Sequence, residues 1–253
     1  MKITLLGTGT SCGVPVIGCR CEVCRSNDPR DRRLRCSIMV ETASTRLLVD
    51  CGPDFREQIL PQPFRRIDGI LVTHSHYDHV GGMDDIRPYC QFGQIRVYAD
   101  AIARKGMLAM LPYCFAENRY PGVPKIELNE VRAGEAFTIG DIDILPVRVM
   151  HGKMPILAYR FGRFAYVTDM KSIDDDQAML LEGVDTLVVN ALRFDNPHHS
   201  HQLVDDAVAF ARRVGARRTL LTHLCHDIGL FDVASARLPE GVELACDGQV
   251  LEL

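Results

Sequence analysis

Short apolar runs with the spacing of β-strands fill most of the chain, and stretches with helical spacing interrupt them in both halves. Residues 142–149 (Ile-Asp-Ile-Leu-Pro-Val-Arg-Val) show the strand pattern, because apolar and polar residues alternate near both ends of the run. The pattern predicts strands over residues 2–6, 37–41, 46–50, 68–72, 95–99, 137–139, 142–149, 157–161, 164–168, 186–191, 219–222, 243–245 and 249–253. It predicts helices over residues 54–60, 101–111, 172–182, 202–214 and 233–238, with Ser172 as the N-cap of the third, and a further helix starting at Val80.

This distribution of elements favours an α/β fold in one domain that spans residues 1–253. Strands and helices occur in both halves, and no linker rich in Gly, Ser or Pro separates the halves. Residues 112–124, which carry Tyr and Pro, are predicted to be irregular. Two sheets, each covered by helices, would fit such a domain.

The chemically richest stretch is Thr73-His74-Ser75-His76-Tyr77-Asp78-His79, which directly follows the apolar run over residues 69–72. It places three imidazoles and a carboxylate within six residues. These side chains suit Zn²⁺, Mn²⁺ or Fe²⁺. The stretch therefore predicts a metal site at the end of a strand.

The nine histidines fall into four places: this stretch, His151, the group 198–201, and the pair His223 and His226. His151, Asp169 and His223 each follow a predicted strand, and strand ends of one sheet can meet at one edge. Together with the first stretch they give seven candidate ligands: His74, His76, Asp78, His79, His151, Asp169 and His223. A tetrahedral zinc needs only four. Seven ligands suit two metal ions with a bridging carboxylate. Two ions about 3.5–4 Å apart can clamp a phosphoryl oxygen and generate a hydroxide.

The H-x-H-x-D-H run at residues 74–79 resembles the signature of the metallo-β-lactamase superfamily, and the order of the later ligands resembles that superfamily too. The resemblance implies a four-layer αβ/βα sandwich. It implies one ion held by His74, His76 and His151, and a second held by Asp78, His79 and His223, with Asp169 bridging. The implied active-site metals are two divalent ions, Zn or Mn.

A second cluster, Cys19, Cys21 and Cys24, has C-x-C-x-x-C spacing and can bind zinc if a fourth ligand completes it. Within the superfamily it resembles the cluster of PhnP-like cyclic phosphodiesterases. That resemblance implies His226 as the fourth ligand and a structural zinc that ties the N-terminal loop to the strand end carrying His223. The other seven cysteines are expected to be small buried thiols.

His201 resembles the family's catalytic histidine that does not bind metal, and His199 is the rival for that position. An imidazole there could act as general acid to the leaving oxygen or stabilise phosphate charge. We take His201 and Asp78 as the catalytic residues. Asp50, at a strand end, is expected to orient a metal-binding imidazole, whereas Lys171, Arg193 and His198 are expected to be solvated.

The net charge and the lengths of the apolar runs limit the partners and the location that the sequence predicts. The net charge is −4 with no long run of one sign, which argues against nucleic acid and membrane as partners and leaves room for a small phosphodiester. The first apolar run is too short for a signal-peptide core, and 18 consecutive apolar residues occur nowhere, so a cytoplasmic protein is expected. The sequence leaves the oligomeric state open, a homodimer included.

The resemblance implies a metal-dependent phosphodiesterase that hydrolyses small cyclic phosphate esters of ribose, 1,2-cyclic or 2′,3′-cyclic, through a di-metal-activated hydroxide. One alternative is a tRNase Z-like RNA 3′-processing nuclease. Such nucleases usually carry a basic arm, and this chain has no inserted segment of that kind. The other is a PqqB-like binding or accessory protein, a branch that has the cysteine cluster but departs from the intact di-metal motif.

Overall fold

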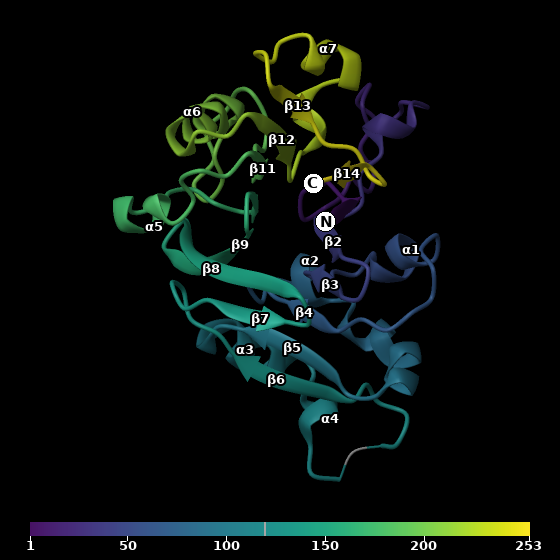
Figure 1. The fold of residues 1–253 in the computed structure, drawn as a ribbon. Helices are drawn as coiled ribbons and strands as arrows, with labels where there is room; N and C mark the ends of the chain where they lie inside the picture. The colour runs from purple at the N-terminus through teal and green to yellow at the C-terminus, as the bar shows by residue number, and fades with distance from the viewer. Residues whose placement is uncertain (119) are drawn as a thin grey trace.

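A computed structural model describes residues 1–118 and 120–253. Within these residues the strands form two seven-stranded sheets (Figure 1). The first sheet contains, in spatial order, β14 (Val250–Glu252), β1 (Lys2–Gly7), β2 (Ser37–Glu41), β3 (Arg46–Val49), β4 (Gly69–Leu71), β5 (Ile95–Ala99) and β6 (Ile126–Glu130). The second contains β13 (Val242–Leu244), β12 (Arg218–Thr222), β11 (Thr186–Asn190), β10 (Phe164–Val167), β9 (Met154–Phe161), β8 (Ile142–His151) and β7 (Phe137–Ile139).

The helices fall into two groups, one for each sheet. Sheet one is accompanied by α1 (Phe55–Ile59), α2 (Tyr77–Val80), the 3₁₀ segment Met83–Phe92, α3 (Ala101–Met110) and α4 (Pro112–Phe115). Sheet two is accompanied by α5 (Asp175–Met179), α6 (Val204–Val214) and α7 (Phe231–Ser235). Two further 3₁₀ turns cover Pro29–Asp31 and His226–Ile228. No helix in the described part of the chain is both long enough and apolar enough to span a membrane.

The side chains between the sheets explain why the layers stack. Along β10, Phe164 and Tyr166 join the apolar cluster shared by both sheets, whereas Ala165 and Val167 face the helices of sheet two. Strand β3 contributes Leu47 and other residues to the same shared cluster. Each fully buried apolar side chain contributes about 1.5–3 kcal/mol, so this central layer is a large part of the stabilising free energy. The expected four-layer αβ/βα sandwich is confirmed.

The two ends of the chain meet in sheet one. Strands β1 and β14 pair antiparallel, and the amino group of Met1 donates a hydrogen bond to the carbonyl of Leu253 at 2.7 Å. Figure 1 shows the N and C labels side by side near the middle of the molecule. That the whole chain is a single domain stays a prediction.

Four local expectations were wrong. Ser172 does not cap a helix, because its backbone bridges Met150 in β8, and α5 begins only after its N-cap Asp174. The helix expected from Val80 begins earlier, at Tyr77, so it carries two of the candidate ligands. The stretch 112–124, predicted to be irregular, begins with α4. Strand β6 was also not anticipated. Residue 119, in the stretch predicted to be irregular, lies outside the described residues.

Candidate metal centre

Three site residues stand directly after a strand with a left-handed backbone. Asp50 follows β3, Asp169 is two residues beyond the end of β10, and His223 follows β12, with φ of 63°, 57° and 56°. Asp and His tolerate this conformation better than branched residues, yet it costs about 1–3 kcal/mol at each position. The turn it produces aims each side chain across the end of its sheet. Such strain persists only where the surrounding structure fixes it.

Asp50 holds two residues of the 73–79 motif by hydrogen bonds. Its Oδ1 accepts the backbone N–H of Thr73 at 2.8 Å, and its Oδ2 accepts the Thr73 hydroxyl at 2.8 Å. Nδ1 of His79 donates to the same Oδ2 at 2.7 Å. The imidazole of His79 is thereby fixed with its proton on Nδ1, so the lone pair of Nε2 points into the site. Sequence reasoning anticipated Asp50 but missed Thr73, whose position before the first motif histidine was the available signal.

Around Nε2 of His79 lies one donor set, formed by Asp78, His79 and His223 with Asp169 beside them. Nε2 of His79 is 3.2 Å from Oδ2 of Asp78 and 3.2 Å from Oδ2 of Asp169. Nε2 of His223 is 3.0 Å from Oδ1 of Asp169 and 3.9 Å from Oδ2 of Asp78. Tetrahedral nitrogen and oxygen ligands of one ion stand roughly 3.4 Å apart, so the spacing suits a divalent metal.

The hydrogen bonding of this set also calls for a cation. Nε2 of His79 and Nε2 of His223 are buried, and neither has a hydrogen-bond partner among the described residues. Two lone pairs that face carboxylate oxygens would repel them, so a positive charge, either a proton or a metal ion, has to lie between. The donor atoms are therefore arranged to surround a cation.

The pKa values of Asp169 and His223 are shifted by the charges of neighbouring site residues. Burial alone raises the pKa of Asp169, but the His223 and His79 imidazoles beside it hold that pKa well below its usual range. Burial lowers the pKa of His223, but Asp169 and Asp78 outweigh burial and raise that pKa to about 9. The two carboxylates thus stay charged and attract a cation.

The second donor set contains His74, His76 and His151, whose ligand atoms lie within 4.8 Å of one another. Nε2 of His74 is 3.1 Å from Nδ1 of His76. Nδ1 of His151, the last residue of β8, donates to the carbonyl of Asp169 at 2.8 Å and leaves Nε2 free to bind. His74 is buried, whereas His76 is exposed and His151 is partly exposed. The site therefore opens to solvent on this side.

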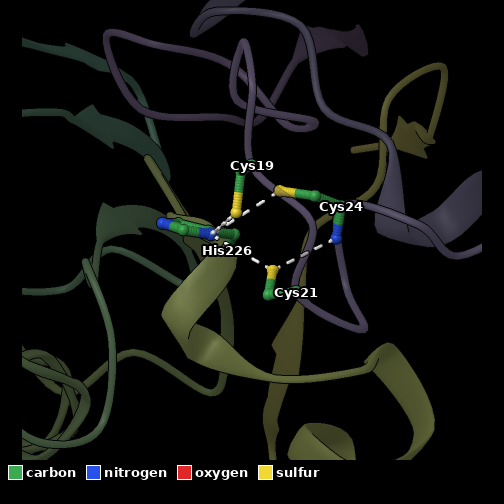
Figure 2. A group of neighbouring side chains, drawn as sticks. All are labelled: Cys19, Cys21, Cys24 and His226. Atoms are coloured by element: carbon green, nitrogen blue, oxygen red, sulfur yellow. Dashed lines mark hydrogen bonds between the residues drawn. The ribbon is translucent and has the colours of Figure 1, made fainter.

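Cys19, Cys21, Cys24 and His226 form a separate cluster (Figure 2). Nδ1 of His226 lies 3.3 Å from the sulfurs of Cys19 and Cys21 and 3.6 Å from that of Cys24. A tetrahedral zinc with Zn–S of about 2.3 Å and Zn–N of about 2.0 Å places S and N roughly 3.5 Å apart. The four side chains fit a closed zinc site. The spacing of the cysteines indicated three of its ligands, and the family resemblance implied His226 as the fourth.

The segment between His223 and His226 fastens this cluster to the donor set described above. The N–H of Leu224 donates to the carbonyl of Thr8 at 3.0 Å, and the N–H of Thr10 donates to the carbonyl of Leu224 at 3.1 Å. The N-terminal loop thus pairs with the residue next to His223. A zinc on the cysteine cluster would close this loop from its other end.

His201 lies beside the donors, whereas His199 does not. The ring of His201 stacks on His223 at 4.6 Å between centroids, and its Nδ1 is 3.6 Å from Oδ1 of Asp169. That nitrogen is buried without a hydrogen-bond partner in the described part of the chain. Burial and the neighbouring His223 lower the pKa of His201 to about 3. His199 is exposed, and its ring lies tilted against that of His198 with 4.4 Å between centroids.

The remaining candidates have local partners. Nζ of Lys171 donates to the carbonyl of His201 at 3.2 Å, so it supports the loop that carries this histidine. Arg193 donates from Nη1 to Asp227 at 2.9 Å and from Nε to the carbonyl of Asn196 at 3.0 Å. Nε and Nη1 of Arg193 are thus occupied by local partners.

These two donor sets on a four-layer sandwich define a class of protein. The family model described as "Beta-lactamase superfamily domain" matches residues 45–224, and the chain belongs to the metallo-β-lactamase superfamily. Its relationship within that superfamily is PhnP-like. A crystal structure of a new diphosphatase from the PhnP family is 39% identical, with a TM-score of 0.91, and the match covers 100% of this chain and 97% of that one.

Two curated relatives complete the comparison. A protein of Porphyromonas gingivalis named octanoyltransferase is 40% identical over 249 residues, which are 98% of this chain and 51% of that protein. A ribonuclease Z of Methanopyrus kandleri is 27% identical over 137 residues, which are 52% of this chain and 45% of that protein. The chain spans about half the length of these relatives or less. The family relationship supports a hydrolase.

Proposed function

We propose that this chain is a metal-dependent phosphodiesterase that hydrolyses small cyclic phosphate esters of ribose, of the 1,2-cyclic or 2′,3′-cyclic kind. The observation that carries the proposal is the pair of donor sets, with Asp169 within 4.8 Å of His79 in one set and of His74 in the other, and with His201 beside them, whose Nδ1 has no hydrogen-bond partner among the described residues. The 39% identity to a diphosphatase of the PhnP family over the whole chain supports phosphorus chemistry.

Two divalent ions held by these residues would supply Lewis-acid stabilisation of the phosphoryl oxygens and a water of lowered pKa. The chain's own residues do the rest. His74, His76 and His151 hold the exposed position, where a substrate can approach from solvent. Asp78, His79 and His223 hold the buried position. Asp50 and the carbonyl of Asp169 each fix the tautomer of one ligating histidine, so the donors are oriented before binding.

His201 faces the same space and has two roles open to it. An imidazole with a pKa of about 3 is neutral near pH 7, so it donates an N–H hydrogen bond more readily than it releases a proton. A bound phosphate dianion or monoanion beside it would raise its pKa. We propose that His201 stabilises charge on the phosphoryl group and on the leaving oxygen. Lys171 would position His201 by donating a hydrogen bond to the His201 carbonyl.

A diphosphate ester is the second candidate substrate, because the 39%-identical structure is described as a diphosphatase. The two candidates differ in the leaving group. A ribose alkoxide departs with a concentrated negative charge that a hydrogen bond from His201 would stabilise, whereas a phosphate leaves as a stable anion. Dependence on His201 should therefore separate them.

The test is a hydrolysis panel with the metal-loaded protein. It contains ribosyl 1,2-cyclic phosphate, a 2′,3′-cyclic nucleotide, bis-p-nitrophenyl phosphate, a nucleoside diphosphate ester, pre-tRNA and an octanoyl thioester. The proposal predicts the highest kcat/KM on a cyclic ribose phosphate. Turnover of the thioester alone, or of pre-tRNA alone, would refute it. A His76→Ala variant serves as the control for contaminating phosphatase, because it removes an exposed donor without opening the core.

A further inference from the structure

Helix α3 carries a glycine at its centre, Gly106, for a reason that lies outside the helix. Glycine inside a helix is less favourable than alanine by about 1 kcal/mol. The backbone of Gly106 does not have a positive φ, so conformation does not require glycine here. A Cβ at this position would lie 2.3 Å from Oγ and 2.5 Å from Cβ of Ser75. The helix therefore approaches the metal-binding motif more closely than any other residue would allow.

Ser75 stands between His74 and His76, two donors of the exposed set. The motif is already held on its other sides. Thr73 is tied to Asp50 by two hydrogen bonds, and the carbonyl of His76 accepts the N–H groups of His79 and Val80 in α2. Gly106 of α3 packs against Ser75, between these two attachments. A displacement of Ser75 would therefore also displace His74 and His76, its two neighbours in the chain.

The helix cannot easily move away instead. Its N-cap Asp100 accepts the N–H of Ala103 at 2.7 Å, and Ala103 and Met107 are buried in the core of sheet one. Nη1 of Arg104 pairs with Glu130 of β6 at 2.6 Å. Packed carbon atoms prefer a separation of about 3.5–4.0 Å, so an added methyl at 106 demands a displacement of roughly 1 Å. Metal–ligand distances in bound sites stay within about 0.2 Å of their usual values, so a displacement of this size that reached His74 or His76 would weaken binding.

We propose that Gly106 is a positioning residue for the metal site: by lacking a side chain it lets α3 hold Ser75 in place, and so sets the spacing of His74 and His76. Gly106 would thus act on metal binding by the chain's own residues, whatever substrate the site accepts.

The experiment compares Gly106→Ala, Ser75→Gly, the double variant, and Leu108→Ala as the matched control. Leu108 is exposed on the same helix, so its truncation changes α3 without reaching the motif. Each protein is stripped of active-site metal and titrated with Mn²⁺ and with Zn²⁺ against a chromophoric chelator. The melting temperature of each stripped protein is recorded in parallel.

We expect Gly106→Ala to weaken the binding of one active-site ion by about 10-fold or more, the size of effect seen when ligand orientation is lost. Ser75→Gly removes both atoms that the methyl would meet, so the double variant should bind as Ser75→Gly does. Leu108→Ala should bind as the native protein does. Native affinity in Gly106→Ala would overturn the proposal. So would a defect that Ser75→Gly does not repair, because the cause would then be the helix itself.

Discussion

Oδ2 of Asp50 lies 2.7 Å from Nδ1 of His79, and both side chains are buried. This contact fixes which nitrogen of His79 carries the proton, and so which nitrogen faces the metal. In Asp50→Asn the amide can present its N–H₂ to Nδ1 and favour the opposite tautomer. We expect active-site metal affinity to fall about 10- to 100-fold. Competition titration measures it, and unchanged affinity would show that Asp50 does not orient the ligand.

The cysteine cluster should be separable from the active site. Cys21→Ser should lose one zinc per chain, retain the two active-site ions, and melt roughly 5–10 °C lower, because a closed zinc site contributes folding free energy. Cys12→Ser is the matched control. The expectation of a buried thiol was wrong for Cys12, which is exposed in the same N-terminal region and belongs to no donor group in the described residues. Equal melting temperatures for the two variants would mean that the cluster carries no structural metal.

The loss of activity on replacing His201 should be larger for an ester with a poorer leaving group. His201→Gln keeps a polar side chain but loses the imidazole beside Asp169. For ribosyl 1,2-cyclic phosphate, whose alkoxide is a poor leaving group, we expect kcat to fall about 100-fold. For bis-p-nitrophenyl phosphate the fall should be less than about 10-fold. Metal content, measured on the same samples, must stay native. Equal losses on both esters would remove His201 from leaving-group departure.

The stripped protein should lose stability as the pH rises. The pKa of His223 is raised from 6.5 to about 9 by Asp169 and Asp78, against the effect of burial. Below pH 6.5 the imidazole is protonated in both the folded and the unfolded chain, and its full stabilising contribution is present. Between pH 6.5 and about 9 the unfolded chain releases the proton first, so the free energy of unfolding decreases. Melting temperatures in chelator across this range should fall, and a flat profile would contradict the assignment.

Bound active-site metal should abolish this decrease in stability with rising pH. When His223 binds a cation it carries no proton on Nε2 in the folded state, so the loaded protein should keep its melting temperature between pH 6.5 and 9. The loaded protein is therefore the control for the stripped one. A parallel decline in both forms would assign the effect to groups outside the donor sets.

The sequence was sufficient for the donor sets because their chemistry is local or follows from strand ends. Residues 74–79 hold four donors within six positions, and His151 ends β8 as its alternating pattern indicated. The two-sheet architecture followed from the same periodicity. The choice between His199 and His201 could not be made with certainty, since it depends on how one loop turns over His223.

Contacts between distant segments explain what sequence reasoning missed. Ser172 resembles an N-cap, but a backbone bridge to Met150 outweighs that local preference. The closeness of Gly106 to Ser75 joins a helix to a loop some thirty residues earlier, and neither segment hints at the other. A lone glycine in a helical pattern was the only signal.

The most direct test of the account is metal analysis of the native protein, purified without chelator and saturated with Zn²⁺ or Mn²⁺. The two donor sets and the cysteine cluster predict about three ions per chain. They also predict about two ions in Cys21→Ser and, in His223→Ala, loss of the ion at the buried position. A single ion per chain, removed by Cys21→Ser and untouched by His223→Ala, would contradict the proposed di-metal hydrolase.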